Sequence, residues 1–411
     1  MKAGAVIIGA SHAGTQAAAA LRQSGWQEPI TLVSNEGCLP YHRPPLSKGF
    51  LSGQQAEDQI LLRGEGFYRD QDITLLNRAE VTQILPDRQE VEAGGAMLPY
   101  TALILATGAS ARRLPVPGHA LENIHMLRSL ADSRLLKERL TAAERIVIIG
   151  GGFIGLEVAA TAAKAGKAVT VIEVQDRLIA RALPPLLSDY FRDLHIQNGV
   201  AFRLNARLDR FEAEGGHVSH VLLADGERLA ADLVLVGVGS DANCSLARQA
   251  GLEIAASGIL VDACCTTSAA SIYAIGDCAA QFNDHTQMVM RVESVQNATD
   301  QARTLAAHLT GKPLPAKGAN WFWSDQYSAK LQMAGIMRDG CDLLLRGDPQ
   351  SGTFSLLQTV DDRLVAAFSV NRAGDHMAAR KLIASGALLD RAVAADSAAP
   401  LAKAVVEMEK A

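Results

Sequence analysis

The chain has 411 residues, of which 48% are hydrophobic and 20% charged, so it can bury large cores and form two or three globular domains. Its net charge of −5 argues against nucleic acid as the main partner. No apolar run approaches the ~20 residues of a membrane helix. The apolar stretch 3–8 ends at Gly9 with no cleavage site after it, which favours a strand over a signal peptide. We therefore expect a cytoplasmic protein that contacts no membrane.

The N-terminal segment is patterned as a βαβ unit. Its expected strand, turn, helix and second strand are residues 5–8, 9–14, 15–24 and 30–33. The turn resembles the glycine-rich turn that binds dinucleotides, but Ser11 replaces its middle glycine. Asn35 and Glu36 follow the second strand, and both are candidates for contact with a ribose.

Residues 145–173 repeat this pattern more strongly. The turn reads Gly150, Gly151, Gly152, Phe153, Ile154 and Gly155, between an apolar strand at 145–149 and an Ala-rich helix at 156–165. Gly150 allows the sharp turn, Gly152 lets a pyrophosphate approach the backbone, and Gly155 lets the helix pack against the strand. The helix N-terminus then offers N–H groups to the phosphates. The segment therefore predicts a dinucleotide site.

An acidic residue ends the second strand of this unit, which we expect at residues 169–172. Glu173 is near the spacing at which a carboxylate holds a ribose 2′-hydroxyl. Because an acid there repels a 2′-phosphate, the sequence favours NADH over NADPH.

Each βαβ unit is followed, after hairpin-like strands, by a closing apolar strand. The strand at 102–106 leads into Thr107 and Gly108, and the strand at 232–236 leads into residues 237–239. The chain therefore carries two nested dinucleotide domains, with a turn-rich linker at 114–118. We expect a discontinuous first domain at 1–112 and 243–318, a second domain at 113–242, and a C-terminal α+β domain of antiparallel strands and helices at 319–411.

A further short strand at 271–275 is followed by Gly276 and Asp277. The carboxyl ends of parallel strands face the ligand crevice, so Asp277 can accept hydrogen bonds from a polyol chain. The alternative is that Asp277 caps a following helix. Farther along, Trp321 and Trp323 share one face of a strand, where aromatic residues more often belong to a core.

Two dinucleotide sites in one chain imply that one cofactor stays bound while another visits. NADH gives a hydride, so the resident group must accept two electrons, as a flavin does. The six cysteines bear on the alternatives, because none forms a C-x-x-C pair or a zinc-ligand pattern. We expect reduced thiols, no metal site, and only packing for the vicinal pair Cys264 and Cys265.

Several longer motifs are more specific than a glycine turn. They are L-P-Y-H-R-P-P-L-S-K at 39–48, A-T-G at 106–108, I-I-G-G-G-F-I-G-L-E at 148–157, A-I-G-D-C at 274–278, V-E-S-V-Q-N-A at 292–298 and W-F-W-S-D-Q at 321–326. In this order they resemble the FAD-dependent NADH:ferredoxin reductases of bacterial oxygenase systems, the family of putidaredoxin reductase and the biphenyl and toluene dioxygenase reductases. The resemblance covers nearly the whole chain and implies a glutathione-reductase-like α/β fold with an added C-terminal domain.

The resemblance also implies the site residues. The FAD site would use Gly9, Ala13, Gly14, Asn35, Glu36, Arg43, Lys48, Val81, Thr107, Gly108, Arg128, Gly276, Asp277, Glu293 and Val295. The NADH site would use Gly150 to Gly155, Glu157, Glu173, Arg181 and Gly239, with Glu293 near the nicotinamide. Relatives often carry an acid where this chain has Asn35, so either Asn35 or Glu36 takes the ribose contact.

Lys48 and Glu157 are the catalytic candidates that the resemblance implies. In related flavoprotein reductases such a pair meets beside the flavin N5, where a fixed ammonium would stabilise the charge of the reduced flavin. The alternatives are a solvated loop lysine and a helix N-terminal acid favoured by the dipole. The electrons would then pass singly to a [2Fe-2S] ferredoxin of the Rieske or putidaredoxin type, serving a Rieske dioxygenase or cytochrome-type monooxygenase.

Two other functions remain open from the sequence. Cys38 lies near the loop where a single-cysteine NADH oxidase or peroxidase would carry its thiol, although a lone cysteine is more often structural. An NADH-sensing flavoprotein resembling apoptosis-inducing factor is the other alternative. For a ferredoxin reductase, the net negative chain requires a local basic patch, for which Arg63 and Arg303 are candidates; each is equally well explained as a solvated charge.

Overall fold

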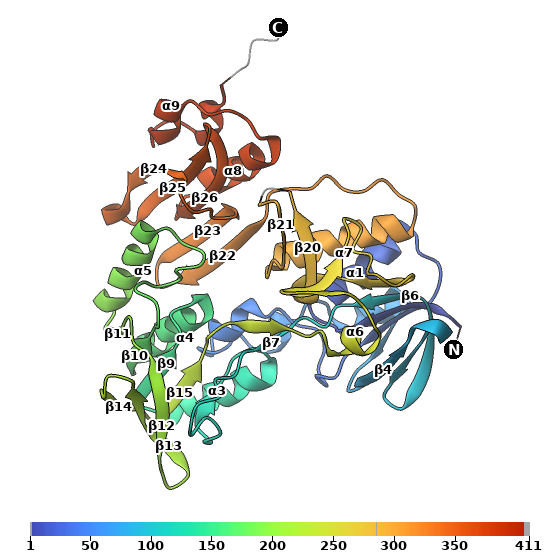
Figure 1. The fold of residues 1–411 in the computed structure, drawn as a ribbon, viewed down its shortest axis with the longest axis horizontal. Helices are drawn as coiled ribbons and strands as arrows, with labels where there is room; N and C mark the ends of the chain where they lie inside the picture. Colours follow the sequence, from blue (N-terminus) through green and yellow to red (C-terminus); the bar gives the residue numbers. More distant parts are fainter. Residues whose placement is uncertain (1, 285, 407–411) are drawn as a thin grey trace. The chain divides into compact units, whose positions relative to one another are not determined.

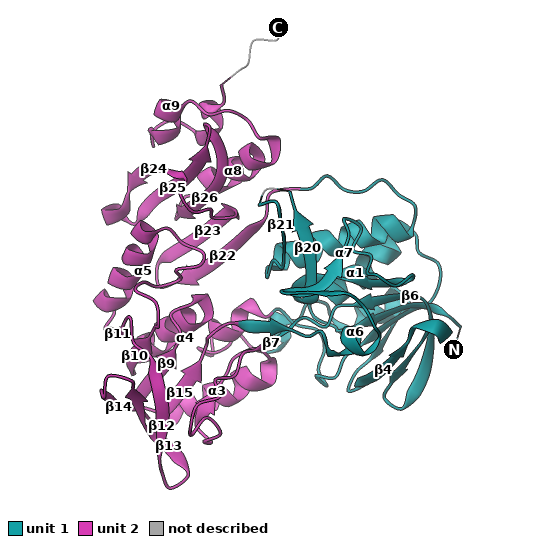
Figure 2. Cartoon of the chain, in the orientation of Figure 1, with its two compact units in different colours: residues 1–42, 57–110, 240–317 teal, residues 43–56, 111–239, 318–411 magenta. Residues whose placement is uncertain are grey.

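The computed structural model describes residues 2–284 and 286–406. The chain divides into two compact units, which Figure 2 shows in different colours. Unit 1 comprises residues 1–42, 57–110 and 240–317, and unit 2 comprises residues 43–56, 111–239 and 318–411.

Unit 1 is built on a sheet whose central strands are parallel and fully buried, as expected for short β-branched runs in an α/β fold (Figure 1). Its parallel strands are, in spatial order, β3 (Ile73–Leu76), β2 (Ile30–Val33), β1 (Gly4–Ile8), β6 (Ala96–Leu105) and β19 (Ile272–Ala274). The first half of β6 also pairs with the antiparallel strands β5 (Glu90–Ala93) and β4 (Val81–Leu85). The sheet therefore has a parallel core with a hairpin extension.

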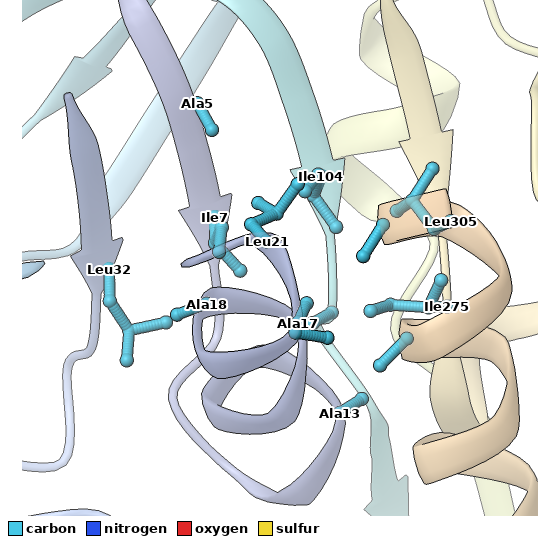
Figure 3. Packing of buried hydrophobic residues seen from close by; sticks show 14 of the residues in the cluster. Ala5, Ile7, Ala13, Ala17, Ala18, Leu21, Leu32, Ile104, Ile275 and Leu305 are labelled. Atoms are coloured by element: carbon cyan, nitrogen blue, oxygen red, sulfur yellow. The ribbon is translucent and has the colours of Figure 1, made fainter. Parts of the chain in front are cut away.

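Two helices pack together beside this sheet, α1 (His12–Ser24) and α7 (Val295–Leu309). The buried residues of α1 are mostly alanine, with Gly14, Thr15 and Leu21, and the small side chains among them let the helix approach both the sheet and α7 closely. Figure 3 shows Ala13 and Ala17 of α1 on the side of Ile275 and Leu305. The remaining elements of the unit are α2 (Glu65–Asp70), α6 (Ser245–Gln249), β17 (Ile254–Ala255), β18 (Gly258–Val261), β20 (Ala279–Asn283) and β21 (Met288–Met290).

Unit 2 repeats the parallel arrangement in its first part. The parallel strands are, in spatial order, β11 (Ala201–Arg203), β10 (Ala168–Ile172), β9 (Arg145–Ile149), β15 (Leu233–Val236) and β8 (Ile124–His125). The helices of this part are α3 (Leu130–Ala142), α4 (Phe153–Lys164) and α5 (Pro185–Gln197), and an antiparallel sheet is formed by β12 (Leu208–Glu214), β13 (His217–Leu223) and β14 (Arg228–Ala230). Four strands follow the same order as in unit 1, so the internal repeat read from the sequence is a repeat of topology over these strands; the fifth strand differs, because β8 precedes the other four in the chain and β19 follows them.

The last part of unit 2 is an antiparallel sheet with helices, as expected. Its strands are, in spatial order, β22 (Trp321–Gln326), β23 (Ala329–Gly335), β26 (Arg363–Val370), β25 (Thr353–Val360) and β24 (Asp342–Asp348), with helices α8 (Ala373–Ser385) and α9 (Arg391–Ala395). In unit 1, the short strand β16 (Ser240–Ala242) pairs with β7 (Ala109–Ala111), of which Ala109 and Ser110 belong to that unit. The expected α/β class with a C-terminal α+β part is confirmed.

Three local expectations were wrong. The two nucleotide helices begin at His12 and Phe153, three residues before the expected starts, because Ser11 and Gly152 are already their N-caps. Asp277 caps no α-helix, since a 3₁₀ turn and then β20 follow it. Trp321 and Trp323 do lie against each other, with ring centroids 5.4 Å apart, but both are only partly buried and so are not core residues. No described helix combines the length and apolarity needed to cross a bilayer.

Candidate active site

The first glycine turn of unit 1 has no room for side chains at its two ends. Gly9 has a φ of +107°, and a Cβ there would lie 2.2 Å from the carbonyl oxygen of Ala106. A Cβ at Gly14 would lie 1.8 Å from the carbonyl oxygen of Gly9. The turn therefore brings the first turn of α1 against β1 and leaves the N-terminus of α1 beyond the strand end, which fits a pyrophosphate.

Asn35 and Glu36 are both exposed at the carboxyl end of β2. The Glu36 carboxylate accepts a hydrogen bond from the hydroxyl of Tyr41, and the Glu36 N–H donates to Ser34 Oγ over 3.3 Å. Glu36 is thus oriented by a side chain of the loop that follows it. This geometry leaves both residues as candidates for the ribose contact.

The end of β6 is tied to the segment that follows β16. The Thr107 hydroxyl donates to the Asn243 carbonyl oxygen over 2.8 Å, and the Asn243 amide donates back to the Thr107 carbonyl oxygen over 2.9 Å. The Asn243 N–H donates to the carbonyl oxygen of Gly108 over 3.0 Å. These bonds fix Thr107 and Gly108 at the carboxyl edge of the parallel sheet, where nucleotide ligands bind in such folds.

The strand end at β19 approaches α1 closely. Gly276 has a φ of +74°, and a Cβ there would lie 2.8 Å from the Cβ of Ala13, while its N–H donates to Gln301 Oε1 over 2.7 Å. Asp277 follows at once and accepts on its backbone carbonyl from Arg291 over 3.2 Å. Unit 1 therefore gathers Gly9, Ala13, Gly14 and Gly276 around one helix N-terminus.

Two other predicted residues of unit 1 lie near the start of α7. Val295 is its first residue, after the N-cap Ser294, whose hydroxyl accepts from the N–H of Asn297 over 3.0 Å. The exposed Glu293 accepts from Ser240 Oγ over 2.8 Å and pairs with Arg291 over 2.9 Å. Glu293 is therefore held in place. The remaining predicted residue, Val81, begins β4 on the hairpin extension.

The glycine turn of unit 2 has the same steric requirements. Gly150 also has a φ of +107°, and a Cβ at Gly155 would lie 2.3 Å from the Gly150 carbonyl oxygen. At the middle position, a Cβ on Gly152 would meet nothing within 4 Å. Gly152 thus leaves open space at the N-terminus of α4, which fits a phosphate group approaching the backbone.

The Glu173 carboxylate accepts two backbone hydrogen bonds. The N–H of Gly151 donates to Oε2 over 2.7 Å, and the N–H of Gln175 donates to Oε1 over 2.9 Å. Its orientation is therefore set by the turn itself. At the end of β15, a Cβ on Gly239 would lie 3.8 Å from a nitrogen of the exposed Arg181, so this predicted NADH residue stands beside the strand end.

The loop that carries Lys48 is fixed to helices of unit 2. Pro44 to Ser47 forms a 3₁₀ turn. Ser133 of α3 donates to the Leu46 carbonyl oxygen over 2.7 Å, and Thr161 of α4 donates to the Ser47 carbonyl oxygen over 2.9 Å. Lys48 therefore does not lie on a freely solvated loop.

Arg43 and Arg128 were assigned to the same cofactor by resemblance, and the structure brings them together. The Arg43 guanidinium donates to the Arg128 carbonyl oxygen over 2.6 Å. Arg128 directly precedes α3, whose N-cap Ser129 forms a capping box with Asp132. The two arginines are thus placed by a well-anchored helix start.

Lys48 and Glu157 meet, as the resemblance implied. The Lys48 ammonium lies 2.7 Å from Glu157 Oε2, with exposed side-chain fractions of 22% for Lys48 and 5% for Glu157. Ser47 Oγ donates to the same carboxylate oxygen over 2.5 Å, and Ser324 Oγ donates to Oε1 over 2.6 Å. A nearly buried carboxylate is thereby paired with a cation and with two hydroxyl groups, as a buried charge requires.

A second layer of polar groups lies behind Ser324. Gln326 Nε2 donates to Ser324 Oγ over 3.2 Å, and Gln326 Oε1 lies 2.8 Å from Nε2 of His195 on α5. Burial lowers the pKa of His195 to about 4, so at neutral pH its ring is uncharged. Its Nε2 then carries the proton and donates to Gln326.

Ser47, Ser324, Gln326 and His195 were not among the residues predicted from the sequence. Ser47 and Ser324 do stand within the quoted R-P-P-L-S-K and W-F-W-S-D-Q motifs, which was the available signal.

The two docking candidates, Arg63 and Arg303, are exposed in unit 1. None of the six cysteines, all of them in the described part of the chain, is in a disulfide. Within that same part, no cluster of three or more metal-ligating side chains is found.

These features define a class of protein. Two parallel sheets with the same order of four strands each present a glycine turn at a helix N-terminus, and one unit holds a Lys–Glu pair whose glutamate is on the helix that follows its turn. The turns fit dinucleotides because a side chain at either end would collide with the backbone. The fold and site are those of an oxidoreductase with two dinucleotide sites.

Comparison with known proteins identifies the family. Residues 4–302 match the family described as pyridine nucleotide-disulphide oxidoreductase, and residues 321–405 match the one described as reductase C-terminal. The chain belongs to the pyridine nucleotide-disulphide oxidoreductase family, which implies that it binds FAD and NAD(H).

The similar proteins cover nearly the whole chain. Rhodocoxin reductase of Rhodococcus erythropolis is 43% identical over 95% of this chain and 92% of its own length. The 5,5'-dehydrodivanillate O-demethylase ferredoxin reductase subunit of Sphingobium sp. is 41% identical over 96% and 97%. In the crystal structure of the covalent putidaredoxin reductase–putidaredoxin complex, the matching chain is 38% identical with a TM-score of 0.94, covering 97% of both chains.

Proposed function

We propose that this chain is an FAD-dependent NADH:ferredoxin reductase that delivers electrons to a [2Fe-2S] ferredoxin of an oxygenase system. Relatives at about 40% identity over nearly the full length are reductases of such systems. The observation that carries the proposal is the Lys48–Glu157 pair, because it joins the R-P-P-L-S-K loop to the helix of the second glycine turn. A chain that only bound dinucleotides would need no buried, paired charge at that place.

The two glycine turns receive different cofactors in this proposal. The turn of unit 1, with Thr107, Asp277 and Val295, binds FAD, and the turn of unit 2, with Glu173 and Arg181, binds NADH. The Glu173 carboxylate supports NADH over NADPH, since its two backbone donors hold a negative charge where a 2′-phosphate would stand. The proposal includes three domains: an FAD domain at 1–112 and 243–318, an NADH domain at 113–242, and a C-terminal domain at 319–411.

In this proposal, Lys48 and Glu157 stabilise the negative charge that forms on the reduced flavin. Bound FAD would take two electrons from NADH and release them one at a time. The Lys48 ammonium, fixed by the Glu157 carboxylate and by the Pro44 carbonyl oxygen at 3.2 Å, stabilises negative charge that develops near it. Because Glu157 is paired within the protein, the ammonium does not need to reorganise during the reaction. Neither residue is required to transfer a proton.

A cytoplasmic location also belongs to the proposal. Cys265 and Cys278 are completely buried, and burial raises the pKa of both thiols, in the case of Cys278 against hydrogen bonds that lower it. No disulfide joins any of the six cysteines, all of which the structure describes. Six cysteines without a disulfide are typical of a protein in a reducing compartment. Their arrangement also gives no support to dithiol chemistry, in spite of the family's name.

The visible spectrum of the purified protein tests the function directly. We expect the absorbance of an oxidised flavin, which anaerobic NADH bleaches and NADPH bleaches far more slowly. Reduction of cytochrome c should then depend on an added [2Fe-2S] ferredoxin. A colourless protein that binds neither adenine cofactor would contradict the proposal. A flavin that reacts slowly with NADH and forms a long-lived charge-transfer complex would instead favour the sensing flavoprotein.

The ferredoxin is proposed to dock at a basic site that includes Arg303 and Arg63. Both are exposed, and Arg303 lies on α7, the helix that begins at Val295. Acidic electron carriers are steered by such charges, so Arg303→Glu should slow ferredoxin reduction severalfold and reverse its salt dependence. Arg88→Glu, an equal charge change on another exposed arginine of unit 1, is the control. If both variants reduce ferredoxin like the wild type, the docking assignment is wrong.

A further inference from the structure

The Glu157 carboxylate is enclosed by donors from two separate parts of unit 2, neither of which is the helix that carries it. Ser47 and Lys48 come from the 3₁₀ loop, Glu157 itself from α4, and Ser324 from β22 of the antiparallel sheet. Ser324 is completely buried. One oxygen of the carboxylate therefore faces the Lys48 loop, and the other faces the C-terminal sheet.

The hydrogen bonds behind Ser324 run in one direction. His195 is neutral and donates from Nε2 to Gln326 Oε1, which leaves the Gln326 amide nitrogen to donate to Ser324 Oγ. The Ser324 hydroxyl has one proton, and its oxygen already accepts from Gln326. That proton is therefore directed to Glu157 Oε1, 2.6 Å away.

The unpartnered nitrogen of His195 supports this assignment. His195 is completely buried, and its Nδ1 has no hydrogen-bond partner among the described residues. A buried N–H without a partner is costly, whereas an unprotonated ring nitrogen costs less. The proton thus belongs on Nε2, where Gln326 accepts it. The whole series of donors ends on the carboxylate that holds Lys48.

We propose that Ser324 is a positioning residue for the Lys48–Glu157 pair, and that Gln326 and His195 orient its hydroxyl. This inference rests on the proposed function for its catalytic meaning, but the contacts stand without it. A carboxylate held by Ser324 at one oxygen cannot rotate away, so the ammonium at the other oxygen keeps one position. The C-terminal sheet therefore sets the geometry of a catalytic pair that lies outside it.

The test compares Ser324→Ala with Ser324→Thr by two measurements. The first is the rate at which acetic anhydride labels Lys48, read by mass spectrometry relative to Lys167, which is paired with Glu144 elsewhere in unit 2. The second is the flavin midpoint potential. Losing a hydrogen bond to a charged group should raise Lys48 labelling about tenfold in Ser324→Ala and lower the potential, and threonine, which keeps the hydroxyl, should restore both.

A double-mutant cycle separates positioning from general stability. In the Glu157→Gln background, Ser324→Ala should have no further effect on Lys48 labelling, because the carboxylate it holds has been removed. Ser369→Ala is the matched control, since Ser369 is equally buried in the same sheet and bonds Ser355 over 3.1 Å. It should leave Lys48 labelling at the wild-type rate.

The outcomes decide the inference independently of the function. If Ser324→Ala leaves Lys48 labelling unchanged, or if its effect persists undiminished in the Glu157→Gln background, the positioning role is wrong. If the wild type carries no flavin, the proposed function fails, but the labelling series still decides whether Ser324 holds the pair. A rise in Lys48 labelling in Ser324→Ala that is reversed in Ser324→Thr supports the inference.

Discussion

The two glycine turns of this chain share their ends and differ in their middles. Gly9 and Gly150 both have a φ of +107°, and Gly14 and Gly155 both stand where a Cβ would collide with the carbonyl oxygen of that first glycine. The middle position is Ser11 in unit 1 and the open Gly152 in unit 2. The shared positions are thus fixed by backbone contact within the fold.

The acids that follow the second strands also differ. Glu36 is exposed and bonded by the Tyr41 side chain, whereas both oxygens of Glu173 accept backbone N–H groups. If NADH binds at unit 2 as proposed, Glu173 is already oriented by its own turn for a cofactor that arrives and leaves repeatedly. The comparison teaches that the fold sets the turn, and it leads us to propose that the side chains around the turn select the nucleotide.

The largest expected effect comes from placing a side chain on the last glycine of each turn. A Cβ would lie 1.8 Å from a backbone oxygen in Gly14→Ala and 2.3 Å away in Gly155→Ala, so helix and strand must separate. We expect Gly14→Ala to yield protein without flavin. Gly155→Ala should keep the flavin, but its rate of reduction by NADH should fall roughly 100-fold (~3 kcal/mol). Flavin content and stopped-flow reduction measure both.

Gly374→Ala is the control for these substitutions, because a Cβ there meets nothing within 4 Å and the residue lies in helix α8. It should change neither flavin content nor reduction rate. If Gly155→Ala lost flavin while Gly14→Ala kept it, the assignment of the two cofactors to the two turns would be reversed.

The next effect concerns coenzyme choice. Glu173→Gln removes the negative charge while keeping an oxygen for one backbone donor, so the ribose contact weakens and 2′-phosphate repulsion disappears. We expect kcat/KM for NADH to fall roughly 10- to 100-fold, as for a lost hydrogen bond to a charged group, and preference over NADPH to shrink. Glu36→Gln should leave the KM for NADH unchanged. If Glu173→Gln and Glu36→Gln changed the KM for NADH equally, Glu173 would not be the acid that selects the coenzyme.

Acid should distinguish the two units by stability. Burial lowers the pKa of His195 and of His376 to about 4, and both lie in unit 2. A histidine with a lowered pKa binds its proton more readily when unfolded, so its stabilising effect is complete above about pH 6.5 and is lost as the pH falls toward 4. At pH 5, each of these histidines should lower the free energy of unfolding by about 2 kcal/mol relative to pH 7.

In unit 1, the pKa of His42 is lowered as well, but this histidine is exposed and should contribute little. Hydrogen exchange at pH 7 and pH 5 should therefore show unit 2 losing protection before unit 1. His376→Phe would flatten the difference, because the buried ring could no longer gain a proton on unfolding. Equal loss of protection in both units would contradict this account.

The elements of the fold could be predicted where sequence and local physics agree. The strands at 30–33 and 145–149 have the predicted limits, because short runs rich in β-branched residues that end at a turn residue favour a buried strand. The starts of α1 and α4 were missed by three residues. A helix can begin directly after the middle residue of the turn, since its first N–H groups are satisfied outside the helix.

The site was predictable only in part. Lys48 and Glu157 stand far apart in the sequence, and resemblance rather than spacing paired them. Ser47 and Ser324 lie inside motifs that carried the resemblance, yet a serine in a sequence does not reveal which carboxylate its hydroxyl will reach. That depends on how β22 packs beside α4, which is a tertiary contact. Residues whose role is a hydrogen bond across elements are the ones that sequence reasoning loses.

The smallest expected effect separates the reductase from a thiol-dependent oxidase. Cys38 follows the acid of unit 1, and residues 174–178, which follow Glu173 in unit 2, contain no cysteine, so a catalytic thiol would be a further difference between the halves. Cys38 is half-buried, and in the described part of the chain no second cysteine forms a disulfide with it. We therefore expect Cys38→Ser to keep NADH-to-ferredoxin turnover within about twofold, since surface substitutions away from a site usually change little. Peroxide-dependent NADH oxidation that disappeared in Cys38→Ser would instead show that the thiol is catalytic. Unit 1 would then carry thiol chemistry in addition to a dinucleotide site, and unit 2 would not.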